Sequence, residues 1–68
     1  MERLTVTTIG KLLIGDRFYK KNDPHKIVLT KMDVEIGKNF AKNDNEKFPK
    51  KYHADTEVIF LRHQNTEL

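Results

Sequence analysis

The chain has 68 residues, of which 34% are charged, and a formal net charge of +3. So short a chain has room for one hydrophobic core, and because it contains no cysteine it cannot stabilise that core with a disulfide or a thiolate zinc site. No apolar run reaches the roughly 18 residues that a membrane helix needs, and the N-terminus does not follow the plan of a signal peptide. We therefore expect a soluble, cytoplasmic protein with one small domain over residues 1–63 and a flexible tail over residues 64–68.

The first third of the chain predicts two strands joined by a short helical turn. Residues 4–7 alternate apolar and β-branched polar side chains, which is typical of a strand. Residues 8–14 contain a glycine that weakens a longer helix, so they predict a single helical turn. After a Gly15-Asp16 corner, residues 17–20 predict a second strand with Phe18 directed inward.

The middle of the chain predicts a hairpin of two longer strands. Residues 21–25, Lys-Asn-Asp-Pro-His, have the composition of a turn. Residues 26–37 alternate with period 2, with Lys31 on the more polar side, and predict the longest strand; its first half is apolar on both faces. Residues 38–42 predict the partner strand, and residues 43–46 predict the turn that ends it.

The last regular segment is residues 55–61, whose apolar run Val-Ile-Phe-Leu predicts a strand buried on both faces. Four or five short strands with almost no helix indicate an all-β fold. The lengths favour a small SH3-like barrel or a curled five-stranded meander with at most one helical turn. A half-barrel that dimerises to complete its core is the alternative.

The composition argues against catalysis. The chain has no serine and no cysteine to serve as a nucleophile, and its three glycines stand too far apart for a phosphate-binding loop. His53 and His63 flank the last strand, roughly 30 Å apart in an extended chain, which is too far for a concerted acid–base pair. The histidines and the nearby aspartates reproduce no recognised metal-ligand spacing. We expect no enzyme activity, no cofactor and no metal.

Residues 38–53 carry five lysines against two acidic residues, and Phe40, Phe48 and Tyr52 lie between the lysines. Aromatic rings can stack on bases while lysines neutralise phosphates, so this segment indicates a surface for single-stranded nucleic acid. The alternative is a solvated loop with Phe40 and Phe48 in the core, an interpretation we favour for Phe48 beside Pro49. The predicted binding residues for a partner or nucleic acid are Tyr19, Lys20, Lys21, Lys38, Lys42, Lys47, Lys50, Lys51 and Tyr52.

The Gly15-Asp16 corner has a structural interpretation. An aspartate after a glycine at the entrance of a strand typically accepts backbone N–H bonds and fixes the turn. Arg17 and Arg62 are the predicted ion-pair partners of Asp16 or of Glu57 on neighbouring strands.

Two motifs also carry a resemblance. The stretches LIGDRFY (residues 13–19) and TEVIFLRH (residues 56–63) resemble a set of short, mostly uncharacterised bacterial proteins of phages, plasmids and other mobile elements. The Gly-Asp-x-Phe corner is also similar to the first strand of many SH3-like barrels. The resemblance implies a small β fold and no established activity.

Taken together, these features predict a non-catalytic binding module. The first hypothesis is a protein-interaction or inhibitor protein of a bacterial mobile element or phage, whose partner is a host protein or a second copy in a homodimer. The alternative is a single-stranded nucleic-acid-binding barrel that uses residues 38–53.

Overall fold

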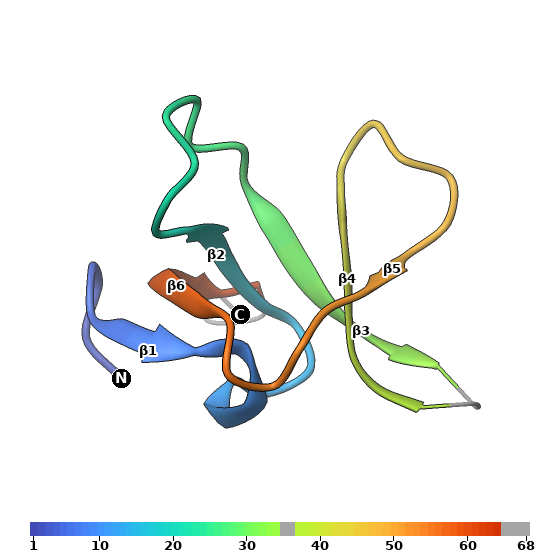
Figure 1. Ribbon diagram of the computed structural model, residues 1–68, viewed down its shortest axis with the longest axis horizontal. Helices are drawn as coiled ribbons and strands as arrows, with labels where there is room; N and C mark the ends of the chain where they lie inside the picture. The colour runs from blue at the N-terminus through green and yellow to red at the C-terminus, as the bar shows by residue number, and fades with distance from the viewer. Residues whose placement is uncertain (35–36, 65–68) are drawn as a thin grey trace.

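The computed structural model describes residues 1–34 and 37–64, without the side chains of residues 33, 34, 37 and 38. Residues 65–68 of the predicted tail lie outside this description. The described residues form six strands and one 3₁₀ turn: β1 (Val6–Thr8), η1 (Ile9–Lys11), β2 (Asp16–Lys20), β3 (Leu29–Val34), β4 (Gly37–Asn43), β5 (Lys50–Lys51) and β6 (Glu57–His63) (Figure 1). The prediction of an all-β fold with at most one helical turn is confirmed.

All six strands belong to one antiparallel sheet, in the order β1-β6-β2-β3-β4-β5. Strands β2 to β5 form a meander, and β6 returns to lie between β2 and β1. Figure 1 shows β1 and β6 running across the direction of β3 and β4, so the sheet is strongly curled. It has six strands where five were expected, and it is open, with β1 and β5 at its two edges.

Several strand boundaries differ from the sequence prediction, and the contacts of β3 and β6 explain two of these differences. Strand β3 begins at Leu29, because the preceding loop is held in a turn by the Asp23 carboxylate. That carboxylate accepts the backbone N–H groups of His25 at 2.9 Å and Ile27 at 3.0 Å. Strand β6 extends to His63, two residues beyond the predicted end, because it pairs with β2 along that length.

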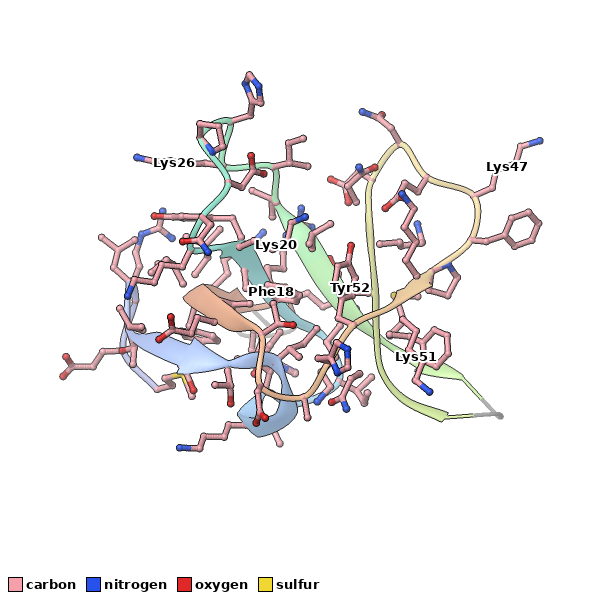
Figure 2. The ribbon with its side chains drawn as sticks, viewed as in Figure 1. Phe18, Lys20, Lys26, Lys47, Lys51 and Tyr52 are labelled. Carbon is pink, nitrogen blue, oxygen red and sulfur yellow. The ribbon has the colours of Figure 1, made fainter. Side chains whose placement is uncertain are left out.

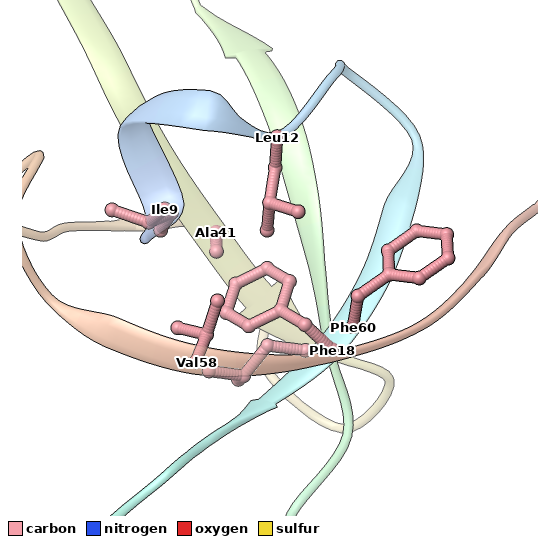
Figure 3. Close-up of a cluster of buried hydrophobic side chains, with 7 residues drawn as sticks. Ile9, Leu12, Phe18, Ala41, Val58 and Phe60 are labelled. Carbon is pink, nitrogen blue, oxygen red and sulfur yellow. The ribbon is translucent and has the colours of Figure 1, made fainter. Parts of the chain in front are cut away.

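The core lies on the concave side of the sheet. The Phe18 ring is 1% exposed and is surrounded by Ile9, Leu12, Ala41 and Val58, as Figure 3 shows. The prediction that Phe18 points inward is therefore confirmed. Ile9 of η1 and Leu12, which follows η1 directly, lie over the sheet. This short 3₁₀ turn therefore acts as a lid on the core, where a further strand would otherwise be needed.

Phe48 lies outside this core, and the prediction that it is a core anchor is wrong. Its side chain is 78% exposed. Phe48 belongs to the loop between β4 and β5, which extends away from the body of the sheet in Figure 1. The prediction that β6 is buried on both faces is only partly right: Val58 and Phe60 are buried, whereas Ile59 and Leu61 on the other face are half-buried.

Lys31 is buried, although the sequence pattern grouped it with the polar side of its strand. Lys31 is the cross-strand partner of Ala41 in β4. Ala41 is fully buried, so both side chains face the core. The Lys31 ammonium donates hydrogen bonds to the carbonyl oxygens of Ile9 at 2.9 Å and Leu12 at 2.7 Å. Ile9 is the first residue of η1 and Leu12 is its C-cap, and we call residues 9–12 the η1 segment. Its buried backbone carbonyls need hydrogen-bond donors. Desolvation lowers the pKa of Lys31, and the nearby Asp16 carboxylate opposes that shift.

A bulge in β6 determines which residues of β2 face the last two residues of β6. Phe18 pairs with Phe60 and Arg17 pairs with Arg62, so Leu61 has no partner position in β2. The extra residue reverses the faces of the residues that follow it. The register then places His63 opposite Asp16.

Asp16 joins three segments at this corner. Its Oδ2 accepts the backbone N–H of Leu13 at 2.8 Å, which confirms the predicted role of Asp16 in the turn. Its Oδ1 lies 2.8 Å from Nδ1 of His63, at hydrogen-bonding distance. The predicted partner Arg17 instead bonds to Asp44 at 3.0 Å, so its pairing with Asp16 or Glu57 was predicted wrongly. Glu57 lies 3.8 Å from Lys21.

We predict that Lys31→Met lowers the free energy of unfolding by about 1–3 kcal/mol, because the Leu12 carbonyl loses its donor while the aliphatic packing is kept. The Ile9 carbonyl keeps only the 3.2 Å bond from the Leu12 N–H. Urea denaturation followed by circular dichroism measures this change. Lys11→Met, at an exposed position of η1, is the matched control and should change stability by much less. Equal effects of the two substitutions would contradict the role of Lys31.

Candidate nucleic-acid interface

The loop between β4 and β5 is ordered by its own polar groups. The Asn43 side chain accepts the N–H of Asn45 at 2.8 Å, and Glu46 Oε1 accepts the N–H of Asn43 at 2.9 Å. Lys42 adds a longer bond of 3.4 Å to the Glu46 carbonyl. These contacts confirm the predicted turn over residues 43–46 and fix the path of the chain into Lys47 and the residues that follow.

The acidic groups of the loop are already paired with cations. Asp44 bonds to Arg17 at 3.0 Å, and Glu46 Oε2 lies 3.3 Å from the Lys50 ammonium. In the part of the chain that the structure describes, Lys47 and Lys51 have no acidic partner. Lys42 also lacks an acidic partner there, but its ammonium contacts the Glu46 carbonyl. Lys47 and Lys51 are exposed, and Figure 2 shows both extending outward from the hairpin.

Aromatic rings accompany the two unpaired lysines. Phe48 follows Lys47 directly and is 78% exposed. Phe40 is a cross-strand partner of Lys51 and is half-buried, on the face of β4 opposite the buried Ala41. We call Phe40, Lys47, Phe48 and Lys51 the basic-aromatic surface.

A second group of the predicted residues gathers on the other side of the hairpin. Lys20, Lys50 and Tyr52 line a hollow of about 150 Å³. The Lys20 ammonium lies 5.8 Å from the centre of the Tyr52 ring, within the range of a cation–π contact. Tyr52 packs against the core, and its burial raises the pKa of the phenol. Tyr52 is therefore part of the scaffold, and Lys20 lies beside it (Figure 2).

The remaining predicted site residues are not part of either group. Tyr19 pairs with Ile59 in the β2–β6 ladder, and the Lys26 ammonium lies 6.0 Å from its ring centre. Lys21 is engaged with Glu57. The Lys42 ammonium contacts the loop backbone, and the Lys38 side chain lies outside the described residues.

Sequence reasoning considered Phe48 as a stacking residue but favoured a core position, and so left it out of the predicted binding residues. A phenylalanine beside a proline can anchor a loop in the core, and the sequence prediction rested on that interpretation. The available signal was its position within the sequence Lys-Phe-Pro-Lys-Lys, where neighbouring lysines keep the backbone at the surface.

In the described ranges, 1–34 and 37–64, no cluster of three or more His, Asp or Glu side chains has the arrangement of a metal site. Within the same ranges, no helix is long and apolar enough to span a membrane.

Comparison with known proteins gives no relative: no family model, no curated protein and no solved structure matches this chain. The resemblance to small proteins of mobile elements therefore stays a prediction.

The Glu46 carboxylate should make the stability of the loop depend on pH. The bond from the Asn43 N–H, helped by Lys50, lowers the pKa of Glu46 below its ordinary value of 4.5. A carboxyl whose pKa is lowered by folding stabilises the folded state fully above its unfolded pKa, and this contribution disappears as the pH falls. We predict that Glu46→Gln reduces the loss of stability between neutral and acidic pH.

Urea unfolding midpoints of the wild type and of Glu46→Gln, measured at several pH values from neutral to acidic, check this prediction. Asp55→Asn, at an exposed position, serves as the control. Parallel pH profiles for the wild type and Glu46→Gln would show that the hydrogen bond from Asn43 does not favour the charged carboxylate.

Proposed function

We propose that the protein is a non-catalytic binding module that binds single-stranded nucleic acid through the basic-aromatic surface. The exposure of Phe48 is the observation that carries the proposal. Exposing a phenylalanine ring to water is unfavourable by the free energy of hydrating its apolar surface, and here no packing contact compensates for it. An unpaired lysine directly before it, and another on β5, give that ring the surroundings of a base-stacking platform.

The arrangement suits a flexible polyanion better than a duplex. Bases of a single strand are free to stack on Phe48 and on the accessible part of Phe40, and every base offers a π-face, so little sequence preference is expected. Lys47 and Lys51 belong to the same hairpin as the two rings, and in this proposal they neutralise phosphates of the bound strand. Because Asp44 and Glu46 are paired with cations, their repulsion of phosphate is reduced.

We predict that Phe48→Ala weakens binding to a fluorescein-labelled oligonucleotide of thymidines or uridines by roughly 5- to 150-fold, the equivalent of about 1–3 kcal/mol for one stacked base. Fluorescence anisotropy measures the dissociation constant. The double variant Lys47→Gln/Lys51→Gln should reduce the dependence of log K on log[salt] by about 0.7 for each phosphate that the variant no longer neutralises.

Two controls separate the surface from general effects of charge and apolar area. Ile27→Ala removes an exposed apolar side chain from another loop, and Lys21→Gln removes a lysine that is engaged with Glu57. Ile27→Ala should change the affinity much less than Phe48→Ala does. Lys21→Gln should change it less than Lys47→Gln/Lys51→Gln does. Absence of binding by the wild type at low salt would rule out the nucleic-acid function.

A protein partner is the second candidate function, and a different observation favours it. Leu13 and Ile14, just before β2, are 69% and 50% exposed. Leu13 also lines a groove of about 650 Å³ together with Phe60 and Leu61. Exposed apolar residues beside a groove of this size are typical of a site that receives an apolar side chain of a partner.

We predict that, if this second function holds, Leu13→Asp abolishes capture of a stoichiometric protein in a pull-down from nuclease-treated lysate. Lys47→Gln/Lys51→Gln should retain the same partner, because its changes lie on the β4–β5 hairpin. A partner that is absent with both variants, or present with both, would contradict a docking site at Leu13.

A further inference from the structure

The two edges of the sheet differ in how they are protected. An edge strand presents unpaired backbone groups to which another strand can pair, and proteins commonly block such edges with lysines and prolines. Strand β5 has both, since it consists of Lys50 and Lys51 and follows Pro49. Strand β1 consists of Val6, Thr7 and Thr8, without charge or proline, and Val6 is 52% exposed.

The backbone of β1 is oriented for pairing on its open side. Alternate residues of an antiparallel strand direct their N–H and C=O groups to the same neighbour. The Thr5 carbonyl accepts the N–H of Phe60 and the Ile9 N–H donates to Thr56, so these alternate positions face β6. The groups of Val6 and Thr8, at the positions between, therefore point away from β6. Within residues 1–34 and 37–64 no other strand pairs with β1 on that side.

We propose that β1 forms an antiparallel pair with β1 of a second copy of this chain, across a two-fold axis at Thr7. In that register Val6 of one copy lies opposite Thr8 of the other, and the two residues exchange both backbone hydrogen bonds. The same exchange occurs on the other side of the axis. Two β1 strands can pair without repulsion because none of their side chains is charged. Two β5 strands would instead bring lysines of like charge together.

The dimer gives the two edges separate roles. Because β1 and β5 lie at opposite edges of the sheet, pairing through β1 leaves both β4–β5 hairpins uncovered. The inference does not depend on what those hairpins bind. If they bind a single strand, the dimer holds two such surfaces on one particle, and a strand long enough to reach both binds more tightly than a short one.

Sedimentation equilibrium over a wide range of concentrations tests the dimer. The wild type should show a concentration-dependent dimer, and Val6→Lys should raise the dissociation constant by about tenfold or more, because it places a charge at the edge. Ile27→Lys is the matched control: Ile27 is 46% exposed, lies in the loop before β3, and its replacement should leave the dimer unchanged. Circular dichroism confirms that the variants are folded.

A cysteine scan tests the register, since the chain has no cysteine of its own. The two Thr7 residues form a non-hydrogen-bonded pair with Cα atoms about 4.5 Å apart, within the roughly 4.4–6.8 Å that a disulfide spans. In an oxidising glutathione buffer, Thr7→Cys should form a covalent dimer much faster than Thr8→Cys, whose counterpart across the axis is Val6. Equal crosslinking rates, or a monomer at every concentration tested, would overturn the proposal.

Discussion

The Asp16 carboxylate accepts the N–H of Leu13 with one oxygen and lies 2.8 Å from the His63 ring with the other. Next to it, the Gly15 N–H donates to the carbonyl of Lys31, and the Gly15 carbonyl accepts the N–H of Gln64. Gly15 has φ = 94°, and a Cβ at this position would lie 3.0 Å from His63 Cε1, so no other residue fits well. This corner fixes the end of the η1 segment against β3 and β6. The lid over Phe18 depends on it.

The same lid explains why a lysine occupies the core. Ile9 and Leu12 cover Phe18 only if their backbone carbonyls are also buried, and the neighbouring strand must then supply a donor. A lysine reaches both carbonyls from β3 with one flexible side chain, and its aliphatic stem packs beside Ala41. A domain of this size has little core to offset the cost of an unpaired buried carbonyl, so Lys31 and Asp16 act together as the polar supports of an apolar lid.

The sequence pattern predicted the elements that depend on local rules. Period 2, turn composition and the Gly15-Asp16 corner were sufficient to place β2, β4 and the two main loops. The burial of Lys31 could not be predicted, because β3 is apolar on both faces at its start, and alternation alone does not say which face meets the lid. The exposure of Phe48 depends on how far the β4–β5 loop extends from the sheet, which is a tertiary property. The bulge at Leu61, which brings His63 to Asp16, likewise left no signal in the sequence.

The two edges of the sheet differ in charge. Unpaired lysines lie on the β4–β5 hairpin, whereas β1 has no charged side chain. A lysine-rich edge resists pairing with its own copy, since like charges would face each other, but it attracts a polyanion. An uncharged edge can pair with its own copy without repulsion, but it does not attract a polyanion. Because β1 and β5 are separated by the whole sheet, neither kind of contact blocks the other, and a single open sheet can accommodate both. Closing the barrel would pair the two edges with each other and remove both surfaces.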